Sequence, residues 1–403
     1  MALLNLSILL ISSQQLGRDI VGQVSLLILN IAVVQIINEI YTGYALVHYI
    51  PKFSVNKLYK TGLVWIILST ALVNLLFLVV KRQWPHLNIG LQDLWIHGLI
   101  LSFIITLHSF HCVILLGKEK IMPYNFLMVF QPLALVAALC VNVFVLGNKT
   151  VSSYIIALYC SYCGSVLLSA WQLLRVLNTK KDSLDLFSTR SVIKNGLVNQ
   201  LGNLAHTLSN RYNYYMIGST ALVGIYASAT SLVESVWIIG SSVAPIILTR
   251  VANQSDTSNI SQVTFLLSKL SFILSCGCVC IIILLPDHFF TFLLGKDFTH
   301  TKTIMLHLAP GVLCISLSTV ISHYFSGLGH QKVQLIANSA GLLTTVCTSY
   351  YLISRYQLIG ACYAASLSYF VASLILVVVF MKQNKFRFRA LFSIRHDFFL
   401  LRK

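Results

Sequence analysis

The sequence predicts an all-α membrane protein with about 12 transmembrane helices in two six-helix bundles related by pseudo-twofold symmetry. Of the 403 residues, 57% are hydrophobic and only 10% are charged, which is far from the composition of a soluble protein. One phrase, His-x4-Leu-Gly-x2-Lys, ends an apolar run twice, at 111–120 and at 323–332. Another apolar run follows each copy, so the phrase indicates the same turn between two spans in each half of a duplicated chain. Gly117 and Gly329 are expected in tight turns with positive φ.

Apolar runs long enough to cross a bilayer, about 20 residues each, predict the individual helices. The opening segment, 2–15, is too short and too polar for a complete span, and it lacks the charged start and cleavage site of a signal peptide. We expect it to be a first helix that is short or truncated. The further spans are expected at 21–49, 67–82, 94–116, 122–147, 151–174, 193–218, 222–249, 264–285, 303–328, 333–354 and 358–381.

A weaker repeat supports the duplication. Leu16-Gly17-x4-Gly22 opens the second span, and Ile217-Gly218-x5-Gly224 opens the eighth. Aligning Gly22 with Gly224 also aligns His48 with Arg250, so each of the two spans has a basic residue at its cytoplasmic end.

The distribution of charge predicts the orientation. Most of the 28 Lys and Arg residues lie in the loops after even-numbered spans or in the C-terminal tail, so the positive-inside rule places both termini in the cytoplasm. The net charge of +17 is spread over short loops rather than one basic face, which argues against a nucleic-acid partner. The longest polar connection lies near the middle. The expected domains are an N-terminal bundle at 1–178, a cytoplasmic linker at 179–192, a C-terminal bundle at 193–381 and a basic cytoplasmic tail at 382–403.

No cofactor, metal site or catalytic residue is expected. The cysteines at 160–163 and 276–280 have metal-like spacing, but no His or carboxylate lies near them within their spans. The loops after odd-numbered spans are short, the longest being about 285–302, and neither a nucleophile–base pair nor a Gly-rich phosphate loop is present. The sequence therefore favours a protein that is not an enzyme.

Three pairs of stretches carry a family resemblance: Leu16–Gly22 with Ala45–Pro51, Ser209–Gly218 with Val223–Ala229, and Gly327–Lys332 with Arg355–Ala361. In order and spacing they resemble the polysaccharide or O-antigen flippases of the multidrug/oligosaccharidyl-lipid/polysaccharide (MOP) exporter superfamily. The family often has Arg where His48 stands and Asp where Asn213 stands.

The resemblance implies transport of an undecaprenyl-pyrophosphate-linked oligosaccharide, such as an O-antigen, capsule or exopolysaccharide repeat unit. The cargo would cross the bacterial inner (plasma) membrane by alternating access between the bundles, coupled to H⁺ or Na⁺. Besides this lipid-linked oligosaccharide, the expected partners are membrane lipids and polysaccharide polymerase or assembly proteins.

Candidate functional residues are the ionisable groups at bilayer depth, because they are costly to keep there. Glu39 and Glu234, in the second and eighth spans, could each bind a proton or sodium ion or pair with a base in the cavity. The alternative is a neutral Glu that ties helices together by hydrogen bonds. The histidines inside spans, His108 among them, are expected in packing or interfacial roles.

An anionic pyrophosphate-sugar head group needs cationic or hydrogen-bonding partners along its route. Candidates near the ends of the relevant helices are Arg18, His48, Lys52, Arg211 and Arg250, with Asn213 beside Arg211. Snorkelling interfacial charges are the alternative for the cationic residues. Arg211 is preferred because asparagines and tyrosines flank it, although that cluster also fits an aromatic belt at the outer interface.

Two other functions stay open. A cation-coupled multidrug antiporter of the same superfamily predicts a narrower, acidic cavity, which the excess of bases near the second, seventh and eighth spans disfavours. A membrane-embedded polysaccharide polymerase or acyltransferase predicts an extended outer loop or a dense His/Asp cluster, which the short loops disfavour.

Overall fold

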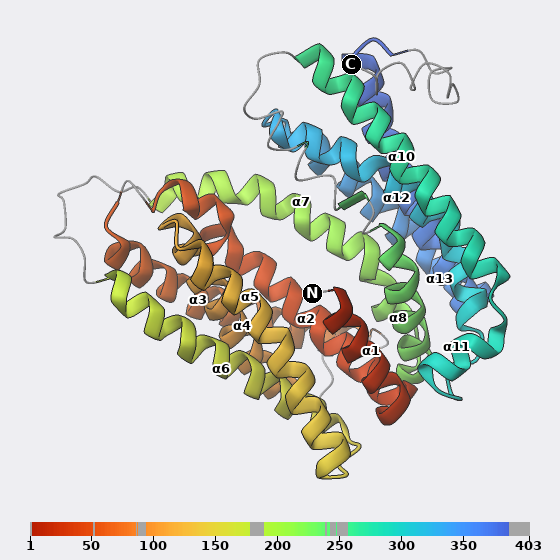
Figure 1. Ribbon diagram of the computed structural model, residues 1–403, viewed down its shortest axis with the longest axis horizontal. Helices are drawn as coiled ribbons and strands as arrows, with labels where there is room; N and C mark the ends of the chain where they lie inside the picture. Colours follow the sequence, from red (N-terminus) through yellow and green to blue (C-terminus); the bar gives the residue numbers. More distant parts are fainter. Residues whose placement is uncertain are drawn as a thin grey trace. The chain divides into compact units, whose positions relative to one another are not determined.

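The computed structural model describes residues 2–50, 53–85, 87, 94–177, 189–237, 240–241, 247 and 257–386, and all regular secondary structure in this part of the chain is helical (Figure 1). The chain divides into two compact units. The first comprises Met1–Leu204, Tyr214–Ala227 and Thr291–Thr299, and the second Ala205–Asn213, Ser228–Phe290 and His300–Lys403. Most of the linker expected at 179–192 and of the tail expected at 382–403 lies outside the described residues. The four-part division expected from the sequence therefore stays a prediction.

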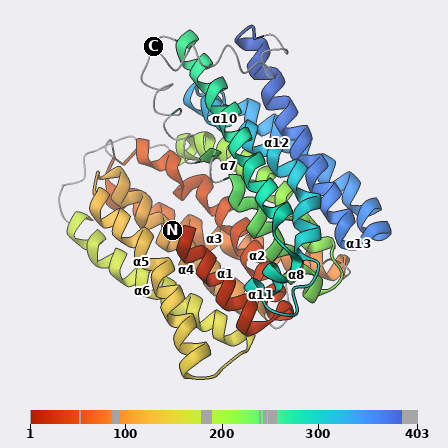
Figure 2. The same cartoon turned by 45° about the vertical axis from the view of Figure 1, so that its right-hand side comes forward.

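The first unit is built mainly from the N-terminal helices. These are α1 (Ala2–Leu16), α2 (Arg18–Thr42), the 3₁₀ helix η1 (Tyr44–His48), α3 (Val55–Gln83), α4 (Trp95–Gly117), α5 (Ile121–Cys140), the π-helical turn η3 (Val141–Val145) and α6 (Val151–Leu177). Helices α4, α5 and α6 lie side by side in both views (Figures 1 and 2). Buried apolar side chains of α2, α4 and α6, such as Leu27, Leu101 and Leu158, form a core between them.

The second unit contains the 3₁₀ helix η4 (Ser235–Trp237), α10 (Thr257–Leu284), α12 (Thr301–Gly327) and α13 (Gln331–Gln383). An aromatic cluster packs α10, α12 and α13 together, with Phe380 close to Phe265, Tyr324 and Phe325. Three further helices, α7 (Thr189–Met216), α8 (Thr220–Glu234) and α11 (Asp287–Leu294), have residues in both units.

Eight helices in the described part of the chain are long and apolar enough to cross a membrane, and the chain is a multi-pass membrane protein. Their surfaces fit a lipid environment. Along α3, large apolar side chains recur on one face at helical spacing and are exposed by about half or more of their area: Val64, Leu68, Leu72, Leu75 and Val79. Such a face is stable against lipid and would be costly in water.

The expected break between the last two spans is confirmed. Gln357 has φ 49° and ψ −124°, so α13 consists of two helices that meet at this residue, between the runs expected at 333–354 and 358–381. Gly360 makes this turn possible, because a Cβ at Gly360 would lie 2.9 Å from the backbone nitrogen of Ile353.

The repeated phrase ends a helix in each half. α4 ends at Gly117 and α12 at Gly327, and the next helix begins four residues later in both places. The same hydrogen bond closes the two ends: the N–H of Lys120 donates to the carbonyl of Leu115, and that of His330 to the carbonyl of Phe325, both at 2.9 Å. The prediction of a turn between two spans is therefore confirmed.

The two ends are nevertheless offset by two residues within the phrase. Positive φ occurs at Glu119 (57°) in the first copy and at Gly329 (73°) in the second. The prediction of a glycine turn is confirmed at Gly329 and is wrong at Gly117. Gly117 is the last helical residue of α4, and its lack of a side chain serves packing instead, because a Cβ there would lie 2.9 Å from Cβ of Ile50.

Two elements differ from the expected spans and loops. The 285–302 connection contains the short helix α11, which follows Pro286, has Asp287 in its first turn and is followed by Gly295 at φ 109°. The run expected as a single span at 222–249 does not begin as one continuous α-helix: α8 ends at Glu234, and the 3₁₀ helix η4 follows from Ser235. Glu234 therefore lies at a change of helix type and not in the middle of a regular helix.

Candidate functional site

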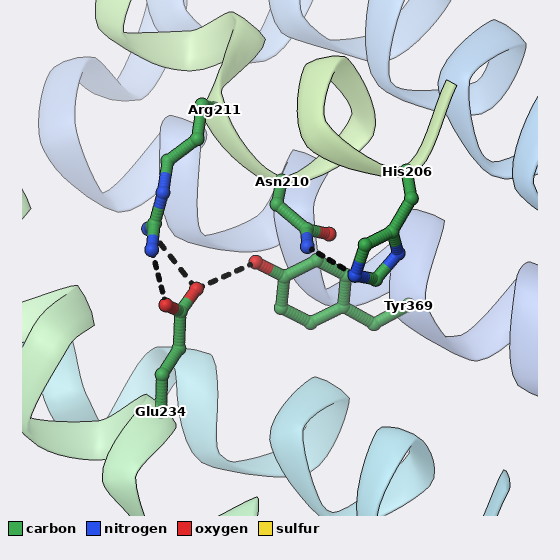
Figure 3. Close-up of polar contacts among 5 residues, drawn as sticks. All are labelled: His206, Asn210, Arg211, Glu234 and Tyr369. Carbon is green, nitrogen blue, oxygen red and sulfur yellow. Dashed lines mark hydrogen bonds and ion pairs between the residues drawn. The ribbon is translucent and has the colours of Figure 1, made fainter. Parts of the chain in front are cut away.

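The structure brings together two of the predicted site residues, Arg211 of α7 and Glu234 of α8, within the second unit (Figure 3). Asn213 lies on α7 close to Arg211. Glu39 lies on α2 and is partly buried, and Arg18 is the exposed first residue of that helix. His48 is the last residue of η1, and its side chain is outside the described part of the structure. Lys52 and Arg250 lie entirely outside the described residues.

Arg211 and Glu234 form a two-pronged ion pair. Nη1 of Arg211 donates to Oε1 of Glu234 at 3.0 Å, and Nη2 donates to Oε2. The hydroxyl of Tyr369 on α13 donates a third hydrogen bond to Oε1 at 3.3 Å, so Glu234 is held from two helices (Figure 3). The carboxylate side chain is 7% exposed and the guanidinium side chain 26%. Planar pairing of this kind is among the strongest side-chain interactions and satisfies a charge that burial would otherwise penalise.

Helix α7 is positioned for this pair by hydrogen bonds to α13. Ser209 lies 2.5 Å from Ser368, hydroxyl to hydroxyl, and Thr345 donates to the carbonyl of Ser209. Asn213 donates to the carbonyl of Ala361 at 2.9 Å and accepts from the hydroxyl of Ser349 at 2.6 Å, which joins α7 to both halves of α13. The fully buried Asn213 therefore uses both ends of its amide to fix the helix that carries Arg211.

Glu39 lines a separate cavity of about 270 Å³ within the first unit. Gln35, one turn earlier on α2, donates to Oε1 of Glu39 at 2.9 Å and to the hydroxyl of Ser109 on α4 at 3.0 Å. Tyr44 and Tyr124 also line the cavity, and their hydroxyls lie 3.4 Å apart. Among the described lining residues there is one carboxyl and no Lys or Arg, so this cavity suits a cation better than an anion.

Asn38, next to Glu39, was not predicted from the sequence, although an amide at bilayer depth is itself a signal. It is fully buried. Its amide donates to the hydroxyls of Thr70 on α3 and Thr106 on α4, both at 2.9 Å, and accepts from Ser69 at 2.5 Å. These bonds tie three helices together and fix the face of α2 that presents Glu39.

His108 lines the cavity that contains Glu39, and the sequence did not single it out as a site. It is 6% exposed, lies on α4, and has Nε2 at 3.8 Å from Sγ of Cys112. Its ring lies edge-on to Tyr162. Across the described residues, no group of three His, Cys, Asp or Glu side chains is arranged to hold a metal ion.

Neither a protein-family model nor a curated protein matches the sequence. Solved structures match it over nearly its whole length. Lipid II flippase MurJ in an inward closed conformation is 14% identical, with a TM-score of 0.66 over 99% of this chain and 93% of that chain. A multidrug resistance MATE family transporter of the MOP superfamily, inward-facing, is 16% identical, with a TM-score of 0.67 over 98% of this chain and 96% of that chain.

A MATE structure in the straight conformation is also similar, at 15% identity and a TM-score of 0.62 over 95% of this chain and 96% of that one. These identities are low, whereas the coverage is high in both directions. The agreement extends from one end of the chain to the other and includes the all-helical architecture. The chain therefore has the fold of the MOP superfamily transporters.

Proposed function

We propose that this protein is a MOP-type transporter that flips an undecaprenyl-pyrophosphate-linked oligosaccharide across a bacterial inner membrane by alternating access. The observation that carries this proposal is the fold, which is similar to that of lipid II flippase MurJ over 99% of the chain. The known proteins with this fold that are named above are transporters, which supports a role in transport rather than in catalysis.

The chemistry of the second unit supports an anionic cargo. A pyrophosphate that leaves water needs a partner of opposite charge, and guanidinium is the side chain that best matches phosphate oxygens. Arg211 supplies a guanidinium on a segment of α7 rich in amides and hydroxyls, including Asn210 and Tyr212. Amide and hydroxyl groups are also suitable hydrogen-bonding partners for sugars.

The remaining parts of the proposal follow the charge distribution of the sequence. Both termini would be cytoplasmic, and Arg18, His48, Lys52 and Arg250 would attract the head group near the ends of the spans. Glu39 would bind the coupling ion, H⁺ or Na⁺, because it is the one carboxyl among the described residues that line its cavity, and no Lys or Arg is among them. Polysaccharide polymerase or assembly proteins would receive the cargo on the other side.

Complementation tests this function directly. A strain that lacks its polysaccharide flippase should regain surface polysaccharide when it expresses this chain, and Arg211→Ala should lower that export relative to the amount of the protein in the membrane. Arg82→Ala, which removes an exposed cation at the end of α3, is the matched control and should export normally. Lack of export by the wild-type chain with every tested polysaccharide system would refute the proposal.

A cation-coupled multidrug antiporter is the second candidate, and the acidic cavity of the first unit favours it. A cavity lined by a carboxyl and by the aromatic residues Tyr44 and Tyr124 is a suitable site for an organic cation. In this case vesicles that contain the wild-type protein would accumulate ethidium when a proton or sodium gradient is applied, and Glu39→Gln would abolish the uptake. Ethidium uptake no greater than that of empty vesicles would exclude this candidate.

A further inference from the structure

We propose that Glu234 occupies the anion-binding face of Arg211 in place of the cargo, and that a pyrophosphate group binds there by displacing it. This inference rests on the proposed function for the identity of the anion. It adds a specific role for Glu234: an internal competitor that keeps the site closed to weakly binding anions.

The geometry of the pair suits such an exchange. Glu234 presents two oxygens to Nη1 and Nη2 of Arg211, the same two-pronged arrangement in which guanidinium binds phosphate. A pyrophosphate oxygen pair can therefore take the place of the carboxylate oxygens without any change in Arg211. Direct exchange of one anion for another never leaves the guanidinium unpaired, so the penalty of a lone buried charge falls on the displaced carboxylate of Glu234 alone.

The two partners differ in accessibility, and the difference favours approach to Arg211. Its side chain is 26% exposed, against 7% for that of Glu234. An incoming anion can therefore reach the guanidinium before the carboxylate has left. A small anion with a single point of contact gains less from Arg211 than the resident carboxylate does, so the competitor also gives selectivity.

Glu234 keeps a hydrogen-bond partner when it is displaced from Arg211. Tyr369 on α13 donates to the same oxygen that Nη1 contacts, and this hydrogen bond does not depend on Arg211 (Figure 3). Glu234 is also the last residue of α8 before the 3₁₀ helix Ser235–Trp237. Hydrogen-bond geometry is poorer in a 3₁₀ helix than in an α-helix, so a local adjustment at this junction can move the side chain.

Binding measurements on the full chain in nanodiscs test the exchange. The probes are undecaprenyl pyrophosphate, the neutral lipid undecaprenol and inorganic pyrophosphate. Removing the competitor should tighten binding: Glu234→Gln is expected to lower the Kd for both pyrophosphate probes about tenfold, the factor for one charge-assisted hydrogen bond. Arg211→Ala should raise the Kd by about tenfold or more on the same reasoning. Undecaprenol should bind all variants equally.

Matched controls separate this mechanism from a general effect of charge. Glu119→Gln removes an exposed carboxyl and Arg82→Ala an exposed guanidinium, and neither should change the Kd. Glu234→Asp keeps the charge but shortens the reach of the competitor, so it should also bind pyrophosphate more tightly than wild type. Glu234→Asp is used in place of Glu234→Gln if the Gln variant does not fold.

The possible results distinguish the exchange from the proposed function. Opposite effects of the Glu234 and Arg211 variants on the Kd for inorganic pyrophosphate support the exchange. If wild-type protein in that case does not bind undecaprenyl pyrophosphate, the exchange stands and the proposed lipid-linked cargo is refuted. If wild-type protein binds undecaprenyl pyrophosphate but the Glu234 variants bind no more tightly, Glu234 is only a structural partner and the exchange is refuted. Failure of both probes to bind wild type and Glu234→Gln also refutes it.

Discussion

Gly22 of α2 and Gly224 of α8 contact each other's helices through the backbone, in a reciprocal manner. A Cβ on Gly22 would lie 2.9 Å from the nitrogen of Gly224 and would overlap the carbonyl of Thr220. A Cβ on Gly224 would lie 3.0 Å from the nitrogen of Gly22 and would overlap the carbonyl of Arg18. Each glycine thus packs on the residue four positions before the other. This is the pattern expected of equivalent segments around a local twofold axis.

A methyl group at either glycine should separate the two helices. Gly22→Ala and Gly224→Ala are each expected to lower the free energy of unfolding by about 1–3 kcal/mol, the usual cost of overpacking, because the obstructing atoms belong to the backbone and cannot rotate away. Gly277→Ala on α10 is the control, since no atom lies within 4 Å of its added Cβ. Thermal unfolding in detergent checks the prediction, and equal stability of Gly22→Ala and Gly277→Ala would contradict it.

Asn38 should contribute more to stability than a typical polar residue of a span. Asn38→Ala removes the bonds to Thr70, Thr106 and Ser69 and leaves these hydroxyls buried, for a loss of about 2 kcal/mol. Asn203→Ala, at an exposed position bonded to Gln200 of its own helix, should cost less than about 0.5 kcal/mol. The two variants can be compared by denaturant or thermal unfolding. A loss for Asn38→Ala as small as the control's would show that the network is not coupled to folding.

The ion pair of Arg211 and Glu234 should show strong energetic coupling. Arg211→Ala leaves a buried carboxylate without its partner charge and is expected to cost about 3–5 kcal/mol. Adding Glu234→Gln to Arg211→Ala should restore part of that stability, because the double variant has no unpaired charge at this position. A double-mutant cycle of unfolding free energies measures the coupling. Strictly additive effects of the two substitutions would mean that the pair does not form in the membrane protein.

Glu39→Gln should uncouple transport from its driving ion. The substitution keeps the size of the side chain but removes the carboxylate from the cavity of the first unit, so transport should lose its dependence on a proton or sodium gradient. The measurement is the transport rate in vesicles with and without each gradient. Glu119→Gln, in the exposed turn after α4, should keep the wild-type dependence. Unchanged gradient dependence in Glu39→Gln would remove this residue from coupling.

The helices were largely predictable because hydropathy reports directly on burial in lipid. The break in α13 at Gln357 falls between two apolar runs, and the end of α12 coincides with the second copy of the repeated phrase. The first copy was less informative at residue level. Gly117 packs against Ile50, a contact between segments far apart in sequence, and the positive φ occurs at Glu119.

The candidate site was predictable as a set of residues but not as an arrangement. Cost at bilayer depth identified Glu234, whereas Arg211 was identified as a cationic partner for an anionic head group, flanked by asparagines and tyrosines. Their pairing depends on how α7 and α8 meet and on the end of α8 at Glu234, neither of which a hydropathy pattern contains. The contact of Tyr369 with Glu234 likewise joins two residues that are 135 positions apart in the sequence.

Translocation in proteoliposomes tests the proposed function most directly. Purified protein is reconstituted with a fluorescent undecaprenyl-pyrophosphate-linked oligosaccharide, and the fraction of label that becomes accessible to a membrane-impermeant quencher is followed with time. The account predicts rapid exposure of the inner-leaflet label with wild-type protein, much slower exposure with Arg211→Ala and wild-type rates with Arg82→Ala. Exposure by wild-type protein no faster than in protein-free liposomes would contradict it.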